Sequence, residues 1–294
     1  MDVVIGLLIF VLGGCVGSFL NVVIYRLPRG ETLLGFSRCP KCQAAIAPQD
    51  NIPVLAWLLL RGRCRRCGQS ISARYPIVEF VVGAMFLGLA VLEWHLQGWN
   101  LPGYDAAGPG GFSAVIALRQ WDLVRIYGYH VSLLCVLLAA AMILFDGHAI
   151  PRKLLGFALL IGLAMPALWP DVHPVACCMP TSESAKSWIE RAGTSVIGLI
   201  TGAMVGAVLG WLAGLFYRGG GQKRSIGTET AALVAVVGLY LGWQASLSTG
   251  VLAAGLLLAA RLIKRESPAR STHGICIFLA AGVQISLWPL LMFA

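Results

Sequence analysis

The sequence predicts an all-α polytopic membrane protein of about eight transmembrane helices, with a small four-cysteine insertion between the first two. Of its 294 residues, 58% are hydrophobic and only 12% are charged, and the mean hydropathy is +0.79. Apolar runs recur that can cross about 30 Å of hydrocarbon as a helix. Two Cys-x-x-Cys pairs lie in the polar segment after the first run. Because so few polar side chains cannot cover a water-exposed surface, the composition excludes a soluble globular domain.

Eight apolar runs define the expected spans. They lie near residues 3–25, 77–97, 130–146, 153–169, 193–217, 229–247, 249–263 and 274–293. The first run follows Asp2 rather than a basic segment and has no small-x-small cleavage site, so we expect it to remain as a membrane helix. The chain then divides into a first helix (1–25), a cysteine loop (26–76) and a bundle (77–294) with irregular or partly ordered outer loops near 98–129 and 170–192.

The positive charges predict the orientation of these spans. With the N-terminus outside, the cytoplasmic loops hold 18 of the 22 Lys and Arg residues. These loops are residues 26–76, 147–153, 218–228 and 261–273. Such segregation is typical of cytoplasmic loops in an inner membrane, and one missed span would spoil it. The formal charge of +9 therefore indicates orientation within a lipid bilayer, and we expect no nucleic-acid partner.

Four of the nine cysteines have the spacing of a metal site. Cys39 and Cys42 form one Cys-x-x-Cys pair, Cys64 and Cys67 form another, and 21 residues separate the pairs. Two such turns supply the four thiolates that a closed structural Zn²⁺ site needs. Two disulfides or four idle thiols are the alternatives, which the reducing side of the membrane disfavours. A nucleic-acid-binding ribbon is disfavoured because membrane helices tether the loop at both ends.

Two acids lie at the expected cytoplasmic ends of spans, where ionisable groups are costly and therefore candidates for function. Asp146 ends the third span and Glu229 opens the sixth. Two carboxyl groups that meet across a bundle cannot both ionise, so one keeps a proton while the other acts as a base toward a shared water. The alternatives are that Glu229 is a helix N-terminal acid beside Thr228 and that Asp146 is an interfacial residue.

Three stretches of sequence carry a resemblance to a known family. They are the run from Gly13 to Pro28, the cysteine pairs around residues 50–57, and Arg74-Tyr75-Pro76-Ile77-Val78-Glu79. Together they resemble the type IV prepilin peptidases, which serve bacterial pili and type II secretion systems. The resemblance implies an inner-membrane aspartic endopeptidase that removes the basic leader of prepilins or pseudopilins at the cytoplasmic face. In many such proteins it also implies methylation of the new N-terminus with S-adenosylmethionine.

The resemblance also implies two catalytic aspartates, and this chain departs from that pattern. Asp146, followed by Ile150-Pro151, matches the first. In the second motif Thr230 stands where the aspartate is expected and Glu229 lies one residue earlier. A threonine cannot share the acid–base role of a carboxylate at neutral pH. Either Glu229 takes the role despite a rotation of about 100° around the helix, or hydrolysis is lost.

Two other functions compete with the hydrolase. The first is a catalytically inactive family member that binds prepilin-like helices or helps to assemble a pilus or type II secretion machine; Thr230 in the aspartate position favours it. The second is a transporter that uses intramembrane acids. The transporter is disfavoured because the candidate acids lie at one membrane face and none lies near the middle of an expected span.

Overall fold

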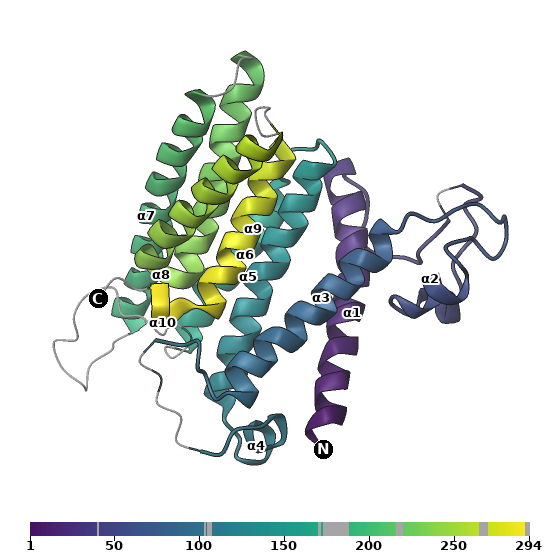
Figure 1. Cartoon of the computed structure of the whole chain (residues 1–294), viewed down its shortest axis with the longest axis horizontal. Helices are drawn as coiled ribbons and strands as arrows, with labels where there is room; N and C mark the ends of the chain where they lie inside the picture. The colour runs from purple at the N-terminus through teal and green to yellow at the C-terminus, as the bar shows by residue number, and fades with distance from the viewer. Residues whose placement is uncertain are drawn as a thin grey trace.

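The computed structural model describes residues 1–39, 41–102, 104, 108–169, 172, 188–215, 220–264 and 270–291, and is a bundle of helices (Figure 1). The bundle comprises α1 (Asp2–Arg26), α3 (Arg74–Ala90), α5 (Trp121–Phe145), α6 (Arg152–Leu168), α7 (Trp188–Leu215), α8 (Gly220–Lys264) and α9 (Arg270–Ser286). Short helical segments lie between and beyond these: η1 (Leu27–Arg29), η2 (Pro48–Asn51), α2 (Leu55–Leu59), η3 (Val91–His95), α4 (Phe112–Ala117) and α10 (Trp288–Leu291). In the described ranges β pairing is limited to two isolated bridges, Arg38–Ala45 and Arg63–Ser70.

The prediction of an all-helical membrane protein is confirmed. Among the described residues, four segments are long and apolar enough to cross a membrane, namely Asp2–Arg29, Arg74–His95, Trp121–Phe145 and Gly227–Ile263, and two shorter apolar helical segments lie at Val196–Leu209 and Thr272–Ser286. Large apolar side chains such as Leu7, Phe80 and Trp211 are exposed on the outside of the bundle, which suits a lipid solvent. The number of eight spans stays a prediction.

Helix α8 contains a sharp reversal at Gly242. This residue has φ 85° and ψ 175°, outside the helical region. The half before it contacts α7 near Gly198, and the half after it returns along the same helix, because Gly250 lies against Val205 and Leu209. The two predicted spans at 229–247 and 249–263 therefore correspond to the two arms of α8 (Figure 1). The turn falls at Gly242 rather than near residue 248 because glycine adopts this backbone conformation without steric cost.

Helix α5 forms the centre of the bundle and is longer than predicted. Its side chains Leu133, Leu137 and Ile143 are fully buried. It begins at Trp121 rather than near residue 130, and α4 precedes it, so the predicted outer loop 98–129 is partly helical. The charge of Asp122 does not prevent this extension, since its carboxylate accepts a hydrogen bond of 2.5 Å from the Tyr104 hydroxyl. Most of the predicted loop 170–192, with Cys177 and Cys178, lies outside the described residues.

The cysteine loop projects to one side of the bundle, near the C-terminal end of α1 (Figure 1). We call this the loop end. The first residue of α3, Arg74, contacts Asp146 at the C-terminal end of α5, so both helix ends lie there. Close packing between α7 and the first arm of α8 sets the position of the arm that carries Glu229. A Cβ atom on Gly206 would lie 2.5 Å from the Cα of Ala231, so only small residues permit this approach.

Candidate functional site

The four predicted cysteine ligands form one cluster. The sulfur atoms of Cys39, Cys42, Cys64 and Cys67 all lie within 4.8 Å of one another, and those of Cys39 and Cys67 are 3.9 Å apart. Sulfur atoms on a tetrahedral zinc ion lie about 3.8 Å apart, given Zn–S bonds of about 2.3 Å. None of the four thiols forms a disulfide. The cluster has the donor set and size to hold one metal ion.

The two Cys-x-x-Cys turns are built in the same way. The Cys39 amide donates to Ala44 O and the Gln43 amide donates to Cys39 O. In the second turn the Cys64 amide donates to Gln69 O and the Gly68 amide to Cys64 O. The residue after each pair has positive φ, 56° at Gln43 and 68° at Gly68. This repeated left-handed turn directs both thiols of a pair to the same side, which explains how segments 21 residues apart make one cluster.

Charged groups near the cluster are arranged around its second turn. The Arg65 guanidinium donates to both carboxylate oxygens of Asp50 at 2.6–3.0 Å, which ties η2 to this turn. This hydrogen bonding lowers the pKa of the Asp50 carboxyl. The backbone N–H groups of Cys67 and Arg66 lower the pKa of the Cys64 thiol to about 7. Thiolate is the form that binds metal, so this backbone geometry favours metal binding by the Cys64 thiol near neutral pH.

The cysteine loop is fastened to the membrane helices at the start of α3. The Glu79 carboxylate accepts a hydrogen bond of 2.7 Å from the Val54 amide, at the beginning of α2. The Asn21 side chain of α1 donates to Tyr75 O at 3.1 Å. These contacts join α1, α2 and the first turns of α3. Asn21, Val54 and Glu79 belong to the three stretches that carry the family resemblance, so these stretches meet at one interface.

Asp146 caps the C-terminal end of α5 and is paired with Arg74. The Arg74 guanidinium lies 2.5 Å from Asp146 Oδ1, and the two side chains are 31% and 22% exposed. The partners are 72 residues apart in the sequence, and the sequence analysis did not pair them. A guanidinium at this distance makes a charge-assisted hydrogen bond to the carboxylate and fixes the direction of its other oxygen.

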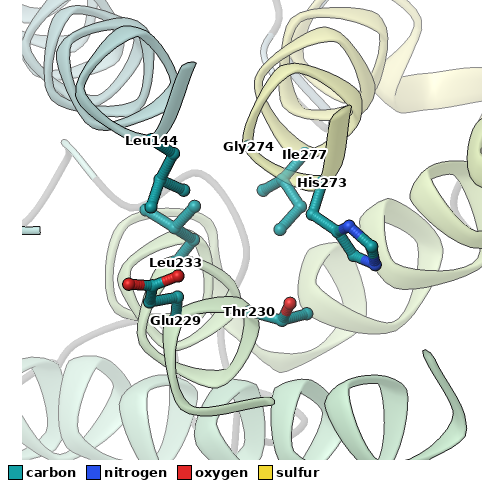
Figure 2. A pocket seen from close by; sticks show the side chains of 7 residues that line it. All are labelled: Leu144, Glu229, Thr230, Leu233, His273, Gly274 and Ile277. Atoms are coloured by element: carbon teal, nitrogen blue, oxygen red, sulfur yellow. The ribbon is translucent and has the colours of Figure 1, made fainter. Parts of the chain in front are cut away.

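Glu229 lines a narrow hollow between three helices. Leu144 of α5, Glu229, Thr230 and Leu233 of α8, and His273, Gly274 and Ile277 of α9 surround it (Figure 2). Figure 2 shows the Glu229 side chain directed toward Leu144 and Leu233, whereas Thr230 and His273 lie on the opposite side of the hollow. Leu144 is two residues before Asp146, so Glu229 lies beside the last turns of α5. A direct pairing of Asp146 with Glu229 stays a prediction.

Thr230 and His273 are both 4% exposed, and the Thr230 hydroxyl has no hydrogen-bond partner. The residue at the expected aspartate position therefore points into the protein. The sequence analysis missed His273, because the residues around it match no motif. Its position after a basic segment, at the start of the last apolar run, was the signal that it would lie at the same end as Glu229.

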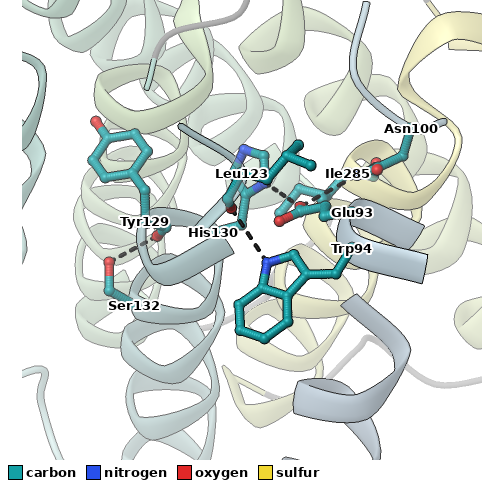
Figure 3. Close-up of polar contacts among 8 residues, drawn as sticks. All are labelled: Glu93, Trp94, Asn100, Leu123, Tyr129, His130, Ser132 and Ile285. Atoms are coloured by element: carbon teal, nitrogen blue, oxygen red, sulfur yellow. Dashed lines mark hydrogen bonds and ion pairs between the residues drawn. The ribbon is translucent and has the colours of Figure 1, made fainter. Parts of the chain in front are cut away.

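A buried polar cluster that no sequence motif indicates lies inside the bundle. Glu93 of η3 and His130 of α5 are fully buried, and His130 Nδ1 lies 2.6 Å from Glu93 Oε1 (Figure 3). The Asn100 amide donates to the same oxygen at 3.3 Å and to Ile285 O at 3.2 Å. The π-helical turn η3 ends α3 and directs Glu93 toward α5, which a regular helical pattern does not predict. The cluster joins α3, α5 and α9 through polar contacts inside the bundle.

Comparisons with known proteins agree with this arrangement. The family model described as the bacterial peptidase A24 N-terminal domain matches residues 11–93, which include the cysteine cluster and its attachments to α1 and α3. No solved structure matches the chain.

Curated relatives cover most of the sequence. A "Prepilin leader peptidase/N-methyltransferase" of Klebsiella pneumoniae is 33% identical over 84% of this chain and 90% of its own length. A "Type 4 prepilin-like proteins leader peptide-processing enzyme" of Escherichia coli O78:H11 is 29% identical over 95% of this chain and 92% of its own length. A Myxococcus xanthus "Prepilin leader peptidase/N-methyltransferase" is 56% identical over 79 residues, 26% of this chain and 24% of its own. The chain therefore belongs to the prepilin leader peptidase family.

Proposed function

We propose that this protein is a membrane-embedded aspartic endopeptidase that removes the basic leader of type IV prepilins or pseudopilins. The observation that carries the proposal is Asp146 at the end of α5, paired with Arg74 and two residues beyond the hollow that Glu229 lines. The segregated Lys and Arg residues support an inner-membrane location with the loop end in the cytoplasm. A substrate with a basic leader and an apolar helix fits such a face, where its leader stays in water and its helix in lipid.

The two acids have different surroundings, which suggests different roles. Asp146 is hydrogen-bonded by Arg74 and is assigned the role of the base that removes a proton from the attacking water. Glu229 lines the hollow together with the apolar side chains of Leu144 and Leu233. It is assigned the role of the acid that protonates the leaving amide nitrogen. Water adds its oxygen to the scissile carbonyl, the C–N bond breaks, and a carboxylate and a free amine result.

Thr230 favours a second candidate function, an inactive family member that binds prepilin-like helices or assists assembly of a secretion or pilus machine. The threonine is buried at the expected aspartate position and brings no titratable group to the hollow. In this case Glu229 is a structural acid near the loop end. Binding of the substrate helix would persist while hydrolysis is absent.

Cleavage of a purified prepilin-like substrate in detergent or vesicles separates the two functions. We expect the wild type to cleave, and Asp146→Asn and Glu229→Gln each to lose at least about 100-fold in kcat, because each removes one half of the acid–base pair. Glu31→Gln, an exposed acid of the cysteine loop, is the matched control. Cleavage by Thr230→Asp but not by the wild type would show that the natural protein is inactive.

For the cysteine cluster we propose a structural Zn²⁺ ion bound by Cys39, Cys42, Cys64 and Cys67. The closed set of four thiolates leaves no position for a substrate, so the metal would hold the loop together rather than take part in hydrolysis. We expect about one zinc per chain in elemental analysis of the reduced, purified protein. A Cys64→Ser/Cys67→Ser variant should contain none, and a wild type without metal would refute the assignment.

The N-methyltransferase activity named for the relatives leads us to propose a site for S-adenosylmethionine. A groove of about 800 Å³ separates the cysteine loop from α1 and α3, a volume typical of small-molecule sites. Trp57 and Tyr75 offer aromatic faces for an adenine ring. The bound donor would supply the methyl group for the new amine. Equilibrium dialysis should detect binding that Trp57→Ala weakens and Arg152→Gln does not.

A further inference from the structure

We propose that Arg74 is a positioning residue for Asp146, through which the cysteine loop controls the geometry of the proposed catalytic acid. The inference rests on the proposed function of Asp146 and extends it to a residue outside the acid pair. Arg74 is the first residue of α3 and follows the second cysteine turn by seven residues. Its contact with Asp146 joins the segment that holds the cysteine cluster to the C-terminal end of α5.

The geometry of the ion pair defines what Arg74 can do. One guanidinium nitrogen contacts Asp146 Oδ1, which leaves Oδ2 to accept a proton from water. Asp146 follows the last turn of α5 and is itself followed by Gly147, whose φ is 78°. Because Asp146 lies after the last turn of α5 and before a glycine, its side chain would otherwise be free to rotate. A fixed guanidinium removes this freedom, and catalytic groups must be held in place for efficient reaction.

Arg74 is itself held by a chain of contacts that starts at the cysteine cluster. Arg63 and Ser70 pair across the second cysteine turn. The next residue, Ile71, donates to Gly62 O at 2.7 Å and accepts from Trp57 Nε1 at 3.0 Å. The Arg74 amide then donates to the Ser72 hydroxyl at 3.3 Å. Ser70, Ile71, Ser72 and Arg74 are thus each held within a segment of five residues. The folded loop therefore determines where α3 begins.

Two further contacts prevent α3 from shifting along its axis. Asn21 of α1 binds Tyr75 O, and Glu79 binds the Val54 amide. The start of α3 is thus fixed by α1 on one side and by the cysteine loop on the other. Arg74 is about one-third exposed, so it is available to respond to a substrate near the loop end. A loop that unfolds would release α3 and, with it, the guanidinium from Asp146.

The experiment compares Arg74→Gln and Arg74→Lys with Arg152→Gln in cleavage of the prepilin-like substrate. Arg152 begins α6 at the same end of the bundle, is exposed, and matches the loss of one positive charge. We expect Arg74→Gln to lower kcat by about 10–100-fold with KM changed less than about threefold, as for loss of one charge-assisted hydrogen bond. Arg74→Lys should recover part of kcat, and Arg152→Gln should resemble the wild type.

A double-substitution cycle tests whether Arg74 acts through Asp146. In an Asp146→Asn background, Arg74→Gln should not lower the residual rate further. Equal kcat for Arg74→Gln and Arg152→Gln, or effects of Arg74→Gln and Asp146→Asn that multiply, would overturn the inference while leaving the peptidase proposal intact. If the wild type does not cleave, the peptidase proposal fails instead. The cycle is then measured on thermal unfolding, where absence of coupling between Arg74 and Asp146 refutes the positioning contact.

Discussion

The buried Glu93–His130 pair should be essential for the stability of the bundle. We consider His130→Leu, which removes the imidazole but keeps an apolar side chain of similar volume. Glu93 then retains only the Asn100 amide, at 3.3 Å, in a position with no exposure to solvent. Removing one partner of a buried pair costs about 3–5 kcal/mol because the other is left uncompensated. We expect this loss of unfolding free energy for His130→Leu.

The double variant Glu93→Leu/His130→Leu should be more stable than His130→Leu alone. It removes the second polar group as well, and Asn100 keeps its hydrogen bond to Ile285 O. Replacing both members of a buried pair by apolar groups is often nearly neutral. Unfolding by SDS titration in mixed micelles, followed by tryptophan fluorescence, measures both variants. The reasoning fails if His130→Leu lies within about 1 kcal/mol of the wild type, or if the double variant is the less stable one.

Three further predictions concern the helix seam and the cysteine loop. A Cβ atom at Gly198 would lie 2.1 Å from Gly238 O, so Gly198→Ala should lower the free energy of unfolding by about 1–3 kcal/mol. At Gly156 an added Cβ meets nothing within 4 Å. Gly156→Ala should therefore be neutral or slightly stabilising in the same SDS titration. In metal-free, reduced protein, Cys64 should be alkylated before the other loop cysteines, because thiolate is the reactive form. The alkylation rate of Cys64 should rise as the pH passes about 7. Equal alkylation rates for the loop cysteines in peptide mapping would contradict this prediction. Metal chelation should increase trypsin cleavage within residues 61–66 while α5 stays intact, because a structural metal stabilises only the fold that binds it. Unchanged cleavage after chelation would argue against a metal-dependent loop.

Composition and spacing predict the helical membrane fold and the cysteine cluster because both depend on simple rules. Within lipid, the backbone hydrogen bonds of an apolar run must be satisfied inside a helix. Two Cys-x-x-Cys turns bring their four thiols together around a single ion. The ends of helices are less predictable where a polar side chain is hydrogen-bonded by a residue distant in the sequence. The first turns of α5, Trp121–Tyr129, accommodate Asp122 because its carboxylate accepts a hydrogen bond from the Tyr104 hydroxyl, and no local pattern in the sequence reveals that contact.

The polar contacts that matter most at the site lie beyond what spacing predicts. Arg74 reaches Asp146 over 72 residues, and Glu93 meets His130 through a π-helical turn. In the sequence, Glu93 looks like an acid at the outer end of a span. Only the packing of α3, α5 and α9 shows that it is buried. The positions of Thr230 and Glu229 relative to α5 also depend on the close approach of α7 to α8 at Gly206 and Ala231, which the expected spans do not predict.

The reversal at Gly242 determines which part of the bundle can open. Its neighbours Tyr240, Leu241 and Ala245 are at most 1% exposed, so these side chains of the apex between the two arms of α8 are packed inside the bundle. Glu229 lies more than three helical turns from that apex. A polypeptide that enters the hollow must therefore spread the helices at the loop end, with the apex as the fulcrum. Widening would be greatest beside the acids and would vanish toward the end of the bundle opposite the loop end.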